Sequence, residues 1–369
     1  MSVPSSAIRP AASTGHPPAV ASSFVPTCLP APRAGVPDGG SPGALSQSLA
    51  ALAQRGPRAS ALALVVAGFP GLHFETDHER AVVDRQHAEA GLDRVALAYL
   101  RGDRAAGGPP GEYLTTLSEQ LRHAEQSRPR LLKAELTGPL SQALQIVDEH
   151  ERPLAYDPAF REALAQHTVL RARWLHDQLA MAGAGALVCL DEPFLDALNS
   201  PFCPLDWEEG IDLLARTLQE VPGQRGLCTT NPPDWNILVE LPVEVVFFDA
   251  YEHSAGLNAA GAAIGGWIER GGALGWGIVP VEAAALAEVQ AESLTRRFVA
   301  GVEALAAVSG LSCERIASQA LISTSGTIAH LPAAQASHAA TLCAAVAAAV
   351  RSAYGFEGMA TPAVVQAQP

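Results

Sequence analysis

Short apolar runs recur between Leu49 and about Tyr354, and they predict buried strands. The runs lie at residues 61–67 (ALALVVA), 93–99 (DRVALAY), 130–136 (RLLKAEL), 185–191 (GALVCLD), 225–230 (RGLCTT), 243–249 (VEVVFFD), 273–279 (ALGWGIV) and 319–324 (QALIST). Strands that are apolar along most of their length are typical of parallel sheets, whose two faces are both covered.

Longer segments with helical periodicity lie between the runs, at 157–183, 206–219, 281–308 and 333–354. Eight strands that alternate with helices over about 300 residues favour an α/β fold, a single (β/α)₈ TIM barrel. The alternative is a doubly wound open sheet, which would need a glycine-rich phosphate-binding turn after its first strand. The chain has AGFPG there instead. We therefore expect residues 46–357 to form one closed barrel.

Both ends of the chain differ from this pattern. Residues 1–45 are rich in Ala, Pro, Ser and Gly and lack apolar periodicity, so we expect a disordered tail that is dispensable for folding. The segment is a poor secretory signal because no cationic start leads into a long apolar core; an organelle-targeting segment is the alternative. Residues 358–369 are expected to form a flexible C-terminal tail.

Composition narrows the classes of partner. The chain has 369 residues, and its 48% hydrophobic content is ample for a full core. Its net charge of −14 argues against a nucleic-acid partner, because phosphate binding needs clustered cations. No apolar run reaches about 18 residues, so we expect no membrane span. The six cysteines are scattered without a CxxC pair, which favours a reducing, cytoplasmic location.

Acidic residues follow two of the predicted strands. Asp191 and Glu192 end the fourth strand, and Asp249 and Glu252 end the sixth. In a barrel these strand ends converge on one mouth, where carboxylates can orient an amino group, bind a metal or move protons. The alternative is that some of them cap the following helices. We predict that Asp191 and Asp249 are catalytic and face the same cavity.

Smaller polar residues follow the fifth and eighth strands, namely Cys228, Thr230 and Ser325. Hydroxyl groups can form hydrogen bonds with a polar ligand in this space. We therefore predict that Thr230 and Ser325, with Glu192 and Glu252, bind substrate.

Five segments carry a family resemblance. They are KAELTGP (133–139), VCLDEPFL (188–195), DRQHAEAGLDRV (84–95), GGALGWGIVP (271–280) and DWNILVELPVEVVFFDAY (234–251). In the order in which they occur along the chain, the five segments resemble segments of cobalamin-independent methionine synthase and its relatives. This superfamily also includes uroporphyrinogen decarboxylase. The chain resembles a short, single-barrel member. The resemblance implies a methyltransferase acting on a small thiol or amino-acid-like substrate, with a small methyl donor and, as a possible partner, a corrinoid protein.

The same resemblance implies an altered zinc site. In the methyltransferase branch, a His-x-Cys pair, a later carboxylate and a late Cys bind zinc, which activates a thiol. Alignment places Cys228 on the His, Thr230 on the first Cys, Asp249 on the carboxylate and Ser325 on the late Cys; a shifted alignment places Cys228 on the Cys and Gly226 on the His. Cys228 and Asp249 alone are an incomplete ligand set. We expect a retained pocket without tight zinc.

Histidines near the predicted mouth are the candidates to complete the ligand set: His253, His330, His73 and His78. His253 ranks first because it follows Asp249 closely. A uroporphyrinogen decarboxylase-like activity is disfavoured, since that branch has an Arg-rich loop after its first strand and residues 65–77 contain no Arg. A non-catalytic ligand-binding protein, or a barrel with other chemistry, remains an alternative.

Overall fold

The computed structural model describes residues 26–31, 33, 46–49, 61–75, 80–111, 121–122, 131–181, 185–232, 234–328 and 331–356. A parallel sheet of eight strands lies at its centre, in the order β1-β11-β10-β9-β8-β7-β5-β2. The strands are β1 (Leu29–Pro30), β2 (Ser46–Leu49), β5 (Leu131–Thr137), β7 (Gly185–Asp191), β8 (Gln224–Cys228), β9 (Val245–Phe248), β10 (Ala273–Val279) and β11 (Ala320–Thr324).

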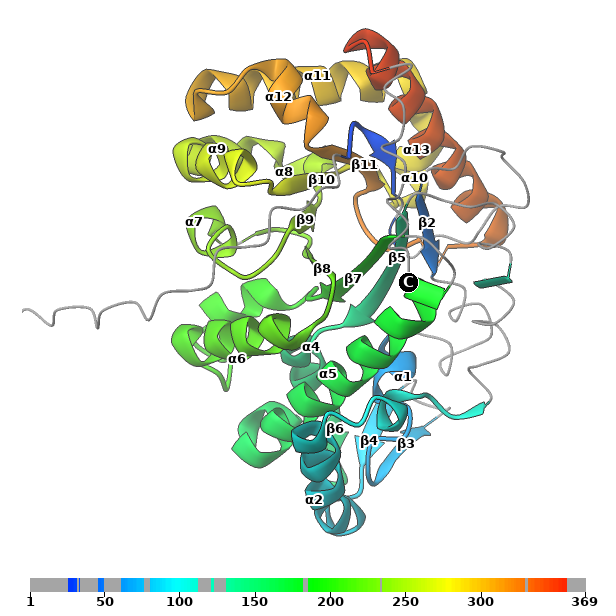
Figure 1. Ribbon diagram of the computed structural model, residues 1–369, viewed down its shortest axis with the longest axis vertical. Helices are drawn as coiled ribbons and strands as arrows, with labels where there is room; N and C mark the ends of the chain where they lie inside the picture. The colour runs from blue at the N-terminus through cyan, green and yellow to red at the C-terminus, as the bar shows by residue number, and fades with distance from the viewer. Residues whose placement is uncertain are drawn as a thin grey trace, which may run out of the picture.

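Helices surround one face of this curved sheet (Figure 1). They are α1 (Ala61–Val66), α2 (Arg85–Arg101), α4 (Pro139–Gln145), α5 (Pro158–Met181), α6 (Trp207–Glu220), α7 (Trp235–Leu238), α8 (Ala250–His253), α9 (Gly261–Glu269), α10 (Ala283–Glu288), α11 (Ala291–Ser309), α12 (Cys313–Ser318) and α13 (Ala333–Ala353). Short 3₁₀ segments are η3 (Ala105–Gly107), η4 (Leu154–Tyr156), η5 (Leu195–Asn199) and η6 (Ser254–Ala260). The four longest predicted helical segments are confirmed, with residues 281–308 divided between α10 and α11.

The expected closed (β/α)₈ barrel is wrong. β1 and β2 lie at opposite edges of the strand order, and within the described residues they do not pair with each other, so the sheet is open. Two predicted strands, 61–67 and 93–99, are helical instead: the first overlaps α1 and the second lies inside α2. The six later predicted strands all appear as β5 and β7–β11. The fold is therefore α/β with an open parallel sheet.

The reason for the error is visible in α2. Asp84 caps its N-terminus by accepting a hydrogen bond from the His87 amide at 3.0 Å, and Gly102 ends it in a left-handed conformation with φ 64°. Between these caps, the apolar run 93–99 is one part of a 17-residue helix. A short run rich in Ala and Leu does not distinguish a strand from a piece of a buried helix.

Side chains alternate between the two faces of the sheet. One face packs against the helices in the main hydrophobic cluster, with Leu132, Leu190 and Phe248 among its members. The opposite face forms a second cluster made only of residues in and beside the strands: Leu29, Ala31, Leu131, Leu187, Cys189, Cys228, Val245, Phe247, Ala273 and Leu321. Because residues of distant strands meet there, we call this the inner face.

A short segment of the expected N-terminal tail is part of the sheet. Leu29 pairs with Leu321, and the Ala31 amide donates to the Ile322 carbonyl at 2.7 Å. Arg351, near the end of α13, donates to the Thr27 carbonyl at 2.6 Å. The expectation of disorder is therefore wrong for residues 26–31 and 33; the remainder of 1–45 and all of 358–369 lie outside the described residues.

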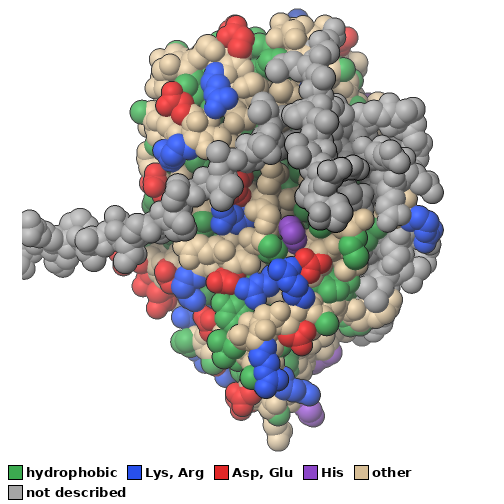
Figure 2. Space-filling model, in the orientation of Figure 1, with side chains coloured by type: hydrophobic (Ala, Val, Ile, Leu, Met, Phe, Trp, Pro, Cys, Tyr) green, Lys and Arg blue, Asp and Glu red, His purple; other side chains and the backbone are tan. Residues whose placement is uncertain are grey.

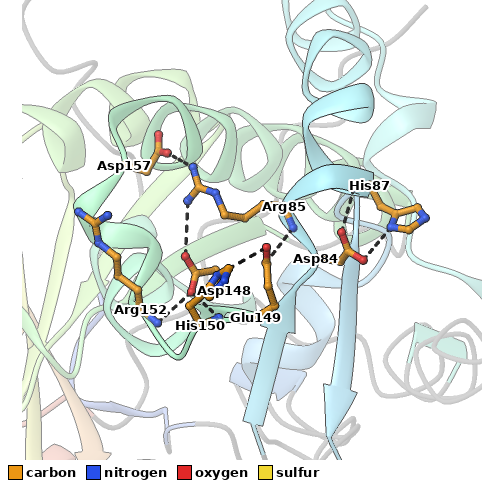
Figure 3. Close-up of polar contacts among 8 residues, drawn as sticks. All are labelled: Asp84, Arg85, His87, Asp148, Glu149, His150, Arg152 and Asp157. Carbon is orange, nitrogen blue, oxygen red and sulfur yellow. Dashed lines mark hydrogen bonds and ion pairs between the residues drawn. The ribbon is translucent and has the colours of Figure 1, made fainter.

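A second, three-stranded sheet consists of β3 (Leu72–Glu75), β4 (Arg80–Val83) and β6 (Val147–Asp148). Arg85, directly after β4, joins it to the start of α5 (Figure 3). The guanidinium donates to Asp157 Oδ2 at 2.5 Å, lies 3.6 Å from Asp148 Oδ2 and stacks over the Phe160 ring at 4.9 Å. These contacts fix the small sheet against the end of the helix that packs on β5 and β7.

One helix in the described residues, α13, is long and apolar enough to cross a membrane by length and composition alone. Its 18-residue window has a mean hydropathy of 1.4 and is 39% buried. The buried residues include Ala339, Cys343 and Val346, which belong to the main hydrophobic cluster. We therefore interpret α13 as a core helix.

Candidate functional site

Four charged side chains form a buried network on the inner face. Arg33, Lys133, Glu135 and Asp191 are each at most 8% exposed. Lys133 Nζ donates to Glu135 Oε1 at 2.7 Å, and Arg33 Nη2 donates to Asp191 Oδ1. Arg33 Nε also lies 3.9 Å from Glu135 Oε2. The network thus contains two cations and two carboxylates, arranged as two linked ion pairs.

The strand register explains why these residues meet. Lys133 and Glu135 point to the same face of β5, since side chains two residues apart share a face. Glu135 pairs with Cys189 on β7, and Asp191 is the last residue of that strand. Arg33 follows β1, and its amide donates to Thr324 Oγ1 at 2.9 Å, at the end of β11. Asp191 at the carboxyl end of β7 and Arg33 beside the end of β11 thus meet Lys133 and Glu135, which lie in the middle of β5.

Burial changes the ionisation of the network. It raises the pKa of Asp191 to about 6, because loss of solvent and the nearby Glu135 together outweigh the attraction of Arg33. Burial opposes the charge of Lys133, but the combined attraction of its neighbours, Glu135 first among them, outweighs burial and raises the pKa of Lys133. The pKa of Arg33 is also raised, because the combined attraction of its neighbours, Asp191 first among them, outweighs burial. Both cations are charged at neutral pH.

Lys133 packs against an aromatic ring as well as a carboxylate. Its ammonium lies 4.3 Å from the centre of the Phe247 ring and donates to the Ala31 carbonyl at 3.3 Å. Ser323 Oγ donates to the same carbonyl at 2.8 Å. The segment around Ala31 is thus attached to both β5 and β11, which fixes the position of Arg33.

Asp249 belongs to the same face as Asp191. Asp191 is in register with Cys228, and Cys228 is in register with Phe247, two residues before Asp249. Asp249 caps α8: its Oδ1 accepts from the Glu252 amide at 3.0 Å. Burial raises the pKa of Asp249, and the Glu252 amide opposes that rise. The capping alternative therefore applies to Asp249.

Glu192 binds the N-terminus of α4. It is fully buried, and it accepts from the Leu140 amide at 3.0 Å and from the Ser141 amide at 2.7 Å. Burial raises its pKa to about 7, although Ser141 and the two amides favour its charged form. A Cβ on Gly138 would lie 2.1 Å from Glu192 Oε1, so this carboxylate and the Gly138–Pro139 turn fit closely. These contacts are those of a structural cap.

The remaining predicted substrate residues differ in exposure. Thr230 and Glu252 are exposed, whereas Ser325 is buried. Ser325 Oγ accepts from the Val281 amide at 3.2 Å. The Thr230 carbonyl accepts from the Asp249 amide at 3.1 Å, so Thr230 lies beside the carboxyl end of β9.

The predicted metal ligands do not form a metal centre in the described residues. Cys228 is fully buried in the inner cluster, where burial, Cys189 and Glu135 together raise the pKa of its thiol well above the ordinary value. A cysteine binds zinc as the thiolate, and a zinc ion usually has four ligands. The described part of the chain contains no group of three or more His, Cys, Asp or Glu residues able to hold a metal ion. The donor set around Cys228 and Asp249 therefore does not fit zinc.

The two candidate histidines within the described residues, His253 and His73, belong to no metal-binding group. His253 is partly exposed at the end of α8, and His73 is exposed on β3; both belong to the described residues. His78 and His330 lie outside the described residues. Sequence patterns missed Arg33 and Lys133. Lys133 had a signal, because a charged residue inside the apolar strand LLKAELT has to find a partner when buried. Arg33 had none, since it lies in a Pro- and Ala-rich stretch.

A groove with a volume of about 270 Å³ lies elsewhere, between α5 and α6. Its charged lining residues include Arg161, Glu162, Glu209 and Arg216, and they pair with one another: Arg216 to Glu162 at 3.2 Å and Arg161 to Glu209 at 3.7 Å. Figure 2 shows basic and acidic side chains interspersed over this lower part of the molecule, so no charge of one sign dominates there. We place the candidate site at the inner-face network instead, because its charges are buried.

Comparisons with known proteins give a limited result. No family model matches the chain, and no curated protein matches it. Among solved structures, the chain is similar to a methyltransferase from Methanosarcina mazei, with a TM-score of 0.46 and 13% sequence identity over 79% of this chain and 77% of that one. This likeness concerns the course of the chain and assigns neither activity nor residues.

Proposed function

We propose that this chain binds a small amino-acid-like or thiol ligand at the carboxyl end of its sheet, and acts on it as a methyltransferase-type enzyme without zinc. The observation that carries the proposal is the buried network of Arg33, Lys133, Glu135 and Asp191. Burying ions costs several kcal/mol each, and apolar residues often replace such pairs without loss of stability. Ligands of open α/β sheets bind outside the carboxyl ends of the strands, and Asp191, the last residue of β7, lies at such an end.

Asp191 has the properties of a contact residue in this proposal. Its side chain is 12% exposed, whereas those of Arg33, Lys133 and Glu135 are at most 4% exposed. Asp191 is therefore the member of the network that a ligand can reach. With a pKa of about 6 it is mostly ionised at neutral pH, so it can bind an ammonium group or accept a proton from a bound thiol. A thiol of pKa near 8.5 would transfer its proton to it at a cost of about 3 kcal/mol.

Asp249 would supply a second carboxylate, with Thr230, Glu252 and Ser325 beside it as polar contacts. Glu192 and Cys228 take no part in the proposed chemistry. Glu192 is committed to the α4 cap, and Cys228 is a buried thiol whose raised pKa makes a thiolate unfavourable. The group that accepts the methyl group would therefore have to belong to the substrate.

The experiment uses methionine and homocysteine as binding probes, by titration calorimetry near pH 7.5. Asp191→Asn should weaken binding at least tenfold, because it removes a partly buried charge. Asp212→Asn is the matched control, since Asp212 is exposed on α6 and pairs only at the surface. Absence of binding for both probes, or equal binding in Asp191→Asn, would reject the proposal.

A non-catalytic ligand-binding protein is the second candidate. It is favoured by the protonated state of Cys228, which removes the nucleophile or metal ligand that the family resemblance would require. A labelled methyl donor with homocysteine separates the two: transfer supports an enzyme, and binding without transfer supports the second candidate. Fewer than about 0.1 zinc per chain, after purification without chelator, is expected in either case because the donor set is incomplete.

A uroporphyrinogen decarboxylase-like activity was disfavoured because residues 65–77, expected to end the first strand, contain no Arg. This segment instead begins within helix α1 and runs into β3. The first strand of the chain in the large sheet is β1, which pairs with β11, and Arg33 follows it. Arg33 is committed to Asp191, however, and does not offer a free charge to an anionic substrate. We therefore still disfavour this activity.

A further inference from the structure

The side chain of Arg33 lies behind Asp191, away from solvent. It is 3% exposed, and it contacts Oδ1 of the Asp191 carboxylate, whose side chain is 12% exposed. No hydrogen bond to Oδ2 accompanies this contact in the described residues. A carboxylate held through one oxygen is restricted in rotation. Arg33 thus supports the Oδ1 side of the Asp191 carboxylate.

The position of Arg33 is itself fixed from several directions. Its amide donates to Thr324 Oγ1 at 2.9 Å, and its carbonyl accepts from the Ile328 amide at 3.1 Å. Two residues earlier, the Ala31 carbonyl accepts from both Lys133 and Ser323. A loose tail would not form four such contacts with two different strands and the loop after β11. The segment is therefore built to present this guanidinium.

We propose that Arg33 is a positioning residue of the site: it keeps Asp191 ionised and directs Oδ2 to the cationic group of the ligand. The residues around Asp191 make this necessary. Glu135 is a second carboxylate in the same network, and Lys133 is paired with it at 2.7 Å. Without Arg33, two carboxylates would share one ammonium in a region of low dielectric constant, where one of them takes up a proton. Asp191, at the exposed end, would lose its charge and its attraction for a cation.

This inference rests on the proposed function for the identity of the ligand group, but its first test needs no ligand. The carboxyl ¹³C resonance of Asp191 is followed against pH in the full-length protein, after assignment with Asp191→Asn. Replacing Arg33 by Met should raise the titration midpoint by at least one pH unit, since an adjacent cation lowers an Asp pKa by about 1–3 units. Arg33→Lys should restore the midpoint to within about half a unit, because it keeps the charge.

Arg351→Met is the matched control. Arg351 donates to the carbonyl and hydroxyl of Thr27, at 2.6 and 2.9 Å, so its loss loosens the same segment without removing the charge beside Asp191. The midpoint should stay within about 0.3 unit. If Arg33→Met does not fold, Arg33→Gln provides the neutral variant. An unchanged or lower midpoint in the neutral variant, or an equal shift in Arg351→Met, would overturn the inference.

The second test separates this inference from the proposed function. Binding of methionine to the wild type, Arg33→Met and Arg33→Lys is measured between pH 5.5 and 8.5. The pH midpoint for binding should follow the Asp191 titration in each variant. A shifted resonance with no methionine binding by any variant rejects the proposed function and leaves Arg33 as the group that holds Asp191 ionised. Binding whose pH midpoint does not move in Arg33→Met rejects the positioning role.

Discussion

Glu192 makes the stability of the protein depend on pH in a direction opposite to that of most acidic residues. Its carboxyl group has a pKa of about 7 in the folded chain, against an ordinary value of 4.5. The folded state therefore binds more protons than the unfolded state between these values. By linkage, this contribution to stability is fully present below pH 4.5 and is lost as the pH rises through 7.

The magnitude follows from the shift. Between pH 5 and pH 8 the free energy of unfolding should fall by about 2.5 kcal/mol through this group alone. Two effects compete in that value. Loss of water around a fully buried carboxyl group disfavours its charge, while the Leu140 and Ser141 amides, at 3.0 and 2.7 Å, favour it. The prediction requires that the loss of water be the larger effect.

The assay compares urea unfolding of the wild type and Glu192→Gln at several pH values from 5 to 8. The variant cannot ionise, so the difference between the two proteins isolates Glu192. Its amide also places an N–H₂ group against backbone donors, which lowers stability by roughly 1–3 kcal/mol at every pH. The wild-type advantage should shrink as the pH rises.

Glu282→Gln is the control. Glu282 is an exposed cap that accepts from the Ala285 amide at 2.8 Å, and this hydrogen bond lowers its pKa. Its contribution to stability should therefore stay nearly constant between pH 5 and 8 and be lost only at lower pH, the opposite sign. If the wild-type advantage over Glu192→Gln is constant or grows from pH 5 to 8, the backbone amides dominate and the reasoning is wrong.

Three further predictions concern packing and reactivity. Gly138→Ala should lower the free energy of unfolding by more than about 2 kcal/mol, because the new Cβ would lie 2.1 Å from Glu192 Oε1. Gly111→Ala, whose new Cβ would have no atom within 4 Å, should change the free energy of unfolding little. Equal effects of the two substitutions in a urea titration would contradict the close fit. Arg85→Leu should lower the free energy of unfolding by about 1–2 kcal/mol, because it removes the contacts in Figure 3. Arg216→Leu should lower it by about 0.5 kcal/mol or less, because the Arg216 side chain is 50% exposed. The reverse order would refute the importance of burial. In native protein at pH 8, a thiol reagent should first modify the partly exposed Cys203 and Cys313. The buried cysteines, Cys28, Cys189, Cys228 and Cys343, should react only after unfolding. Rapid modification of Cys228 in a Cys203→Ser, Cys313→Ser variant would show that its thiol is accessible.

The second half of the fold was predictable from sequence because its strands are buried on both faces. The runs that became β5, β7 and β10 are apolar along most of their length, which separates them from the amphipathic helices around them. The runs at 61–67 and 93–99 have the same composition as a buried helix face, and only their caps and neighbours decide the outcome. Local pattern alone therefore misassigned the first third of the chain.

The candidate site was predictable only at the ends of correctly assigned strands. Asp191 and Asp249 were singled out because parallel strands present their last residues at one edge, and their catalytic role stays a prediction. The role of Glu192 depended on the distance to the Ser141 amide, 51 positions away, which no local pattern contains. Arg33 required the pairing of β1 with β11, between residues 29 and 321. Contacts between such distant segments are tertiary, and their partners cannot be read from the residues beside them.

The pairing of β1 with β11 also bears on how the protein is made. Arg33 emerges early during synthesis and Asp191 near the middle of the chain, but the strand that holds the N-terminal segment ends at Thr324. Arg351, which anchors Thr27, follows later still. Until these parts have left the ribosome, Arg33 is not held beside Asp191, whereas Glu135 already has Lys133 on its own strand. The charged network can thus be completed only after almost the whole chain is available, so its formation is expected to be one of the last steps of folding.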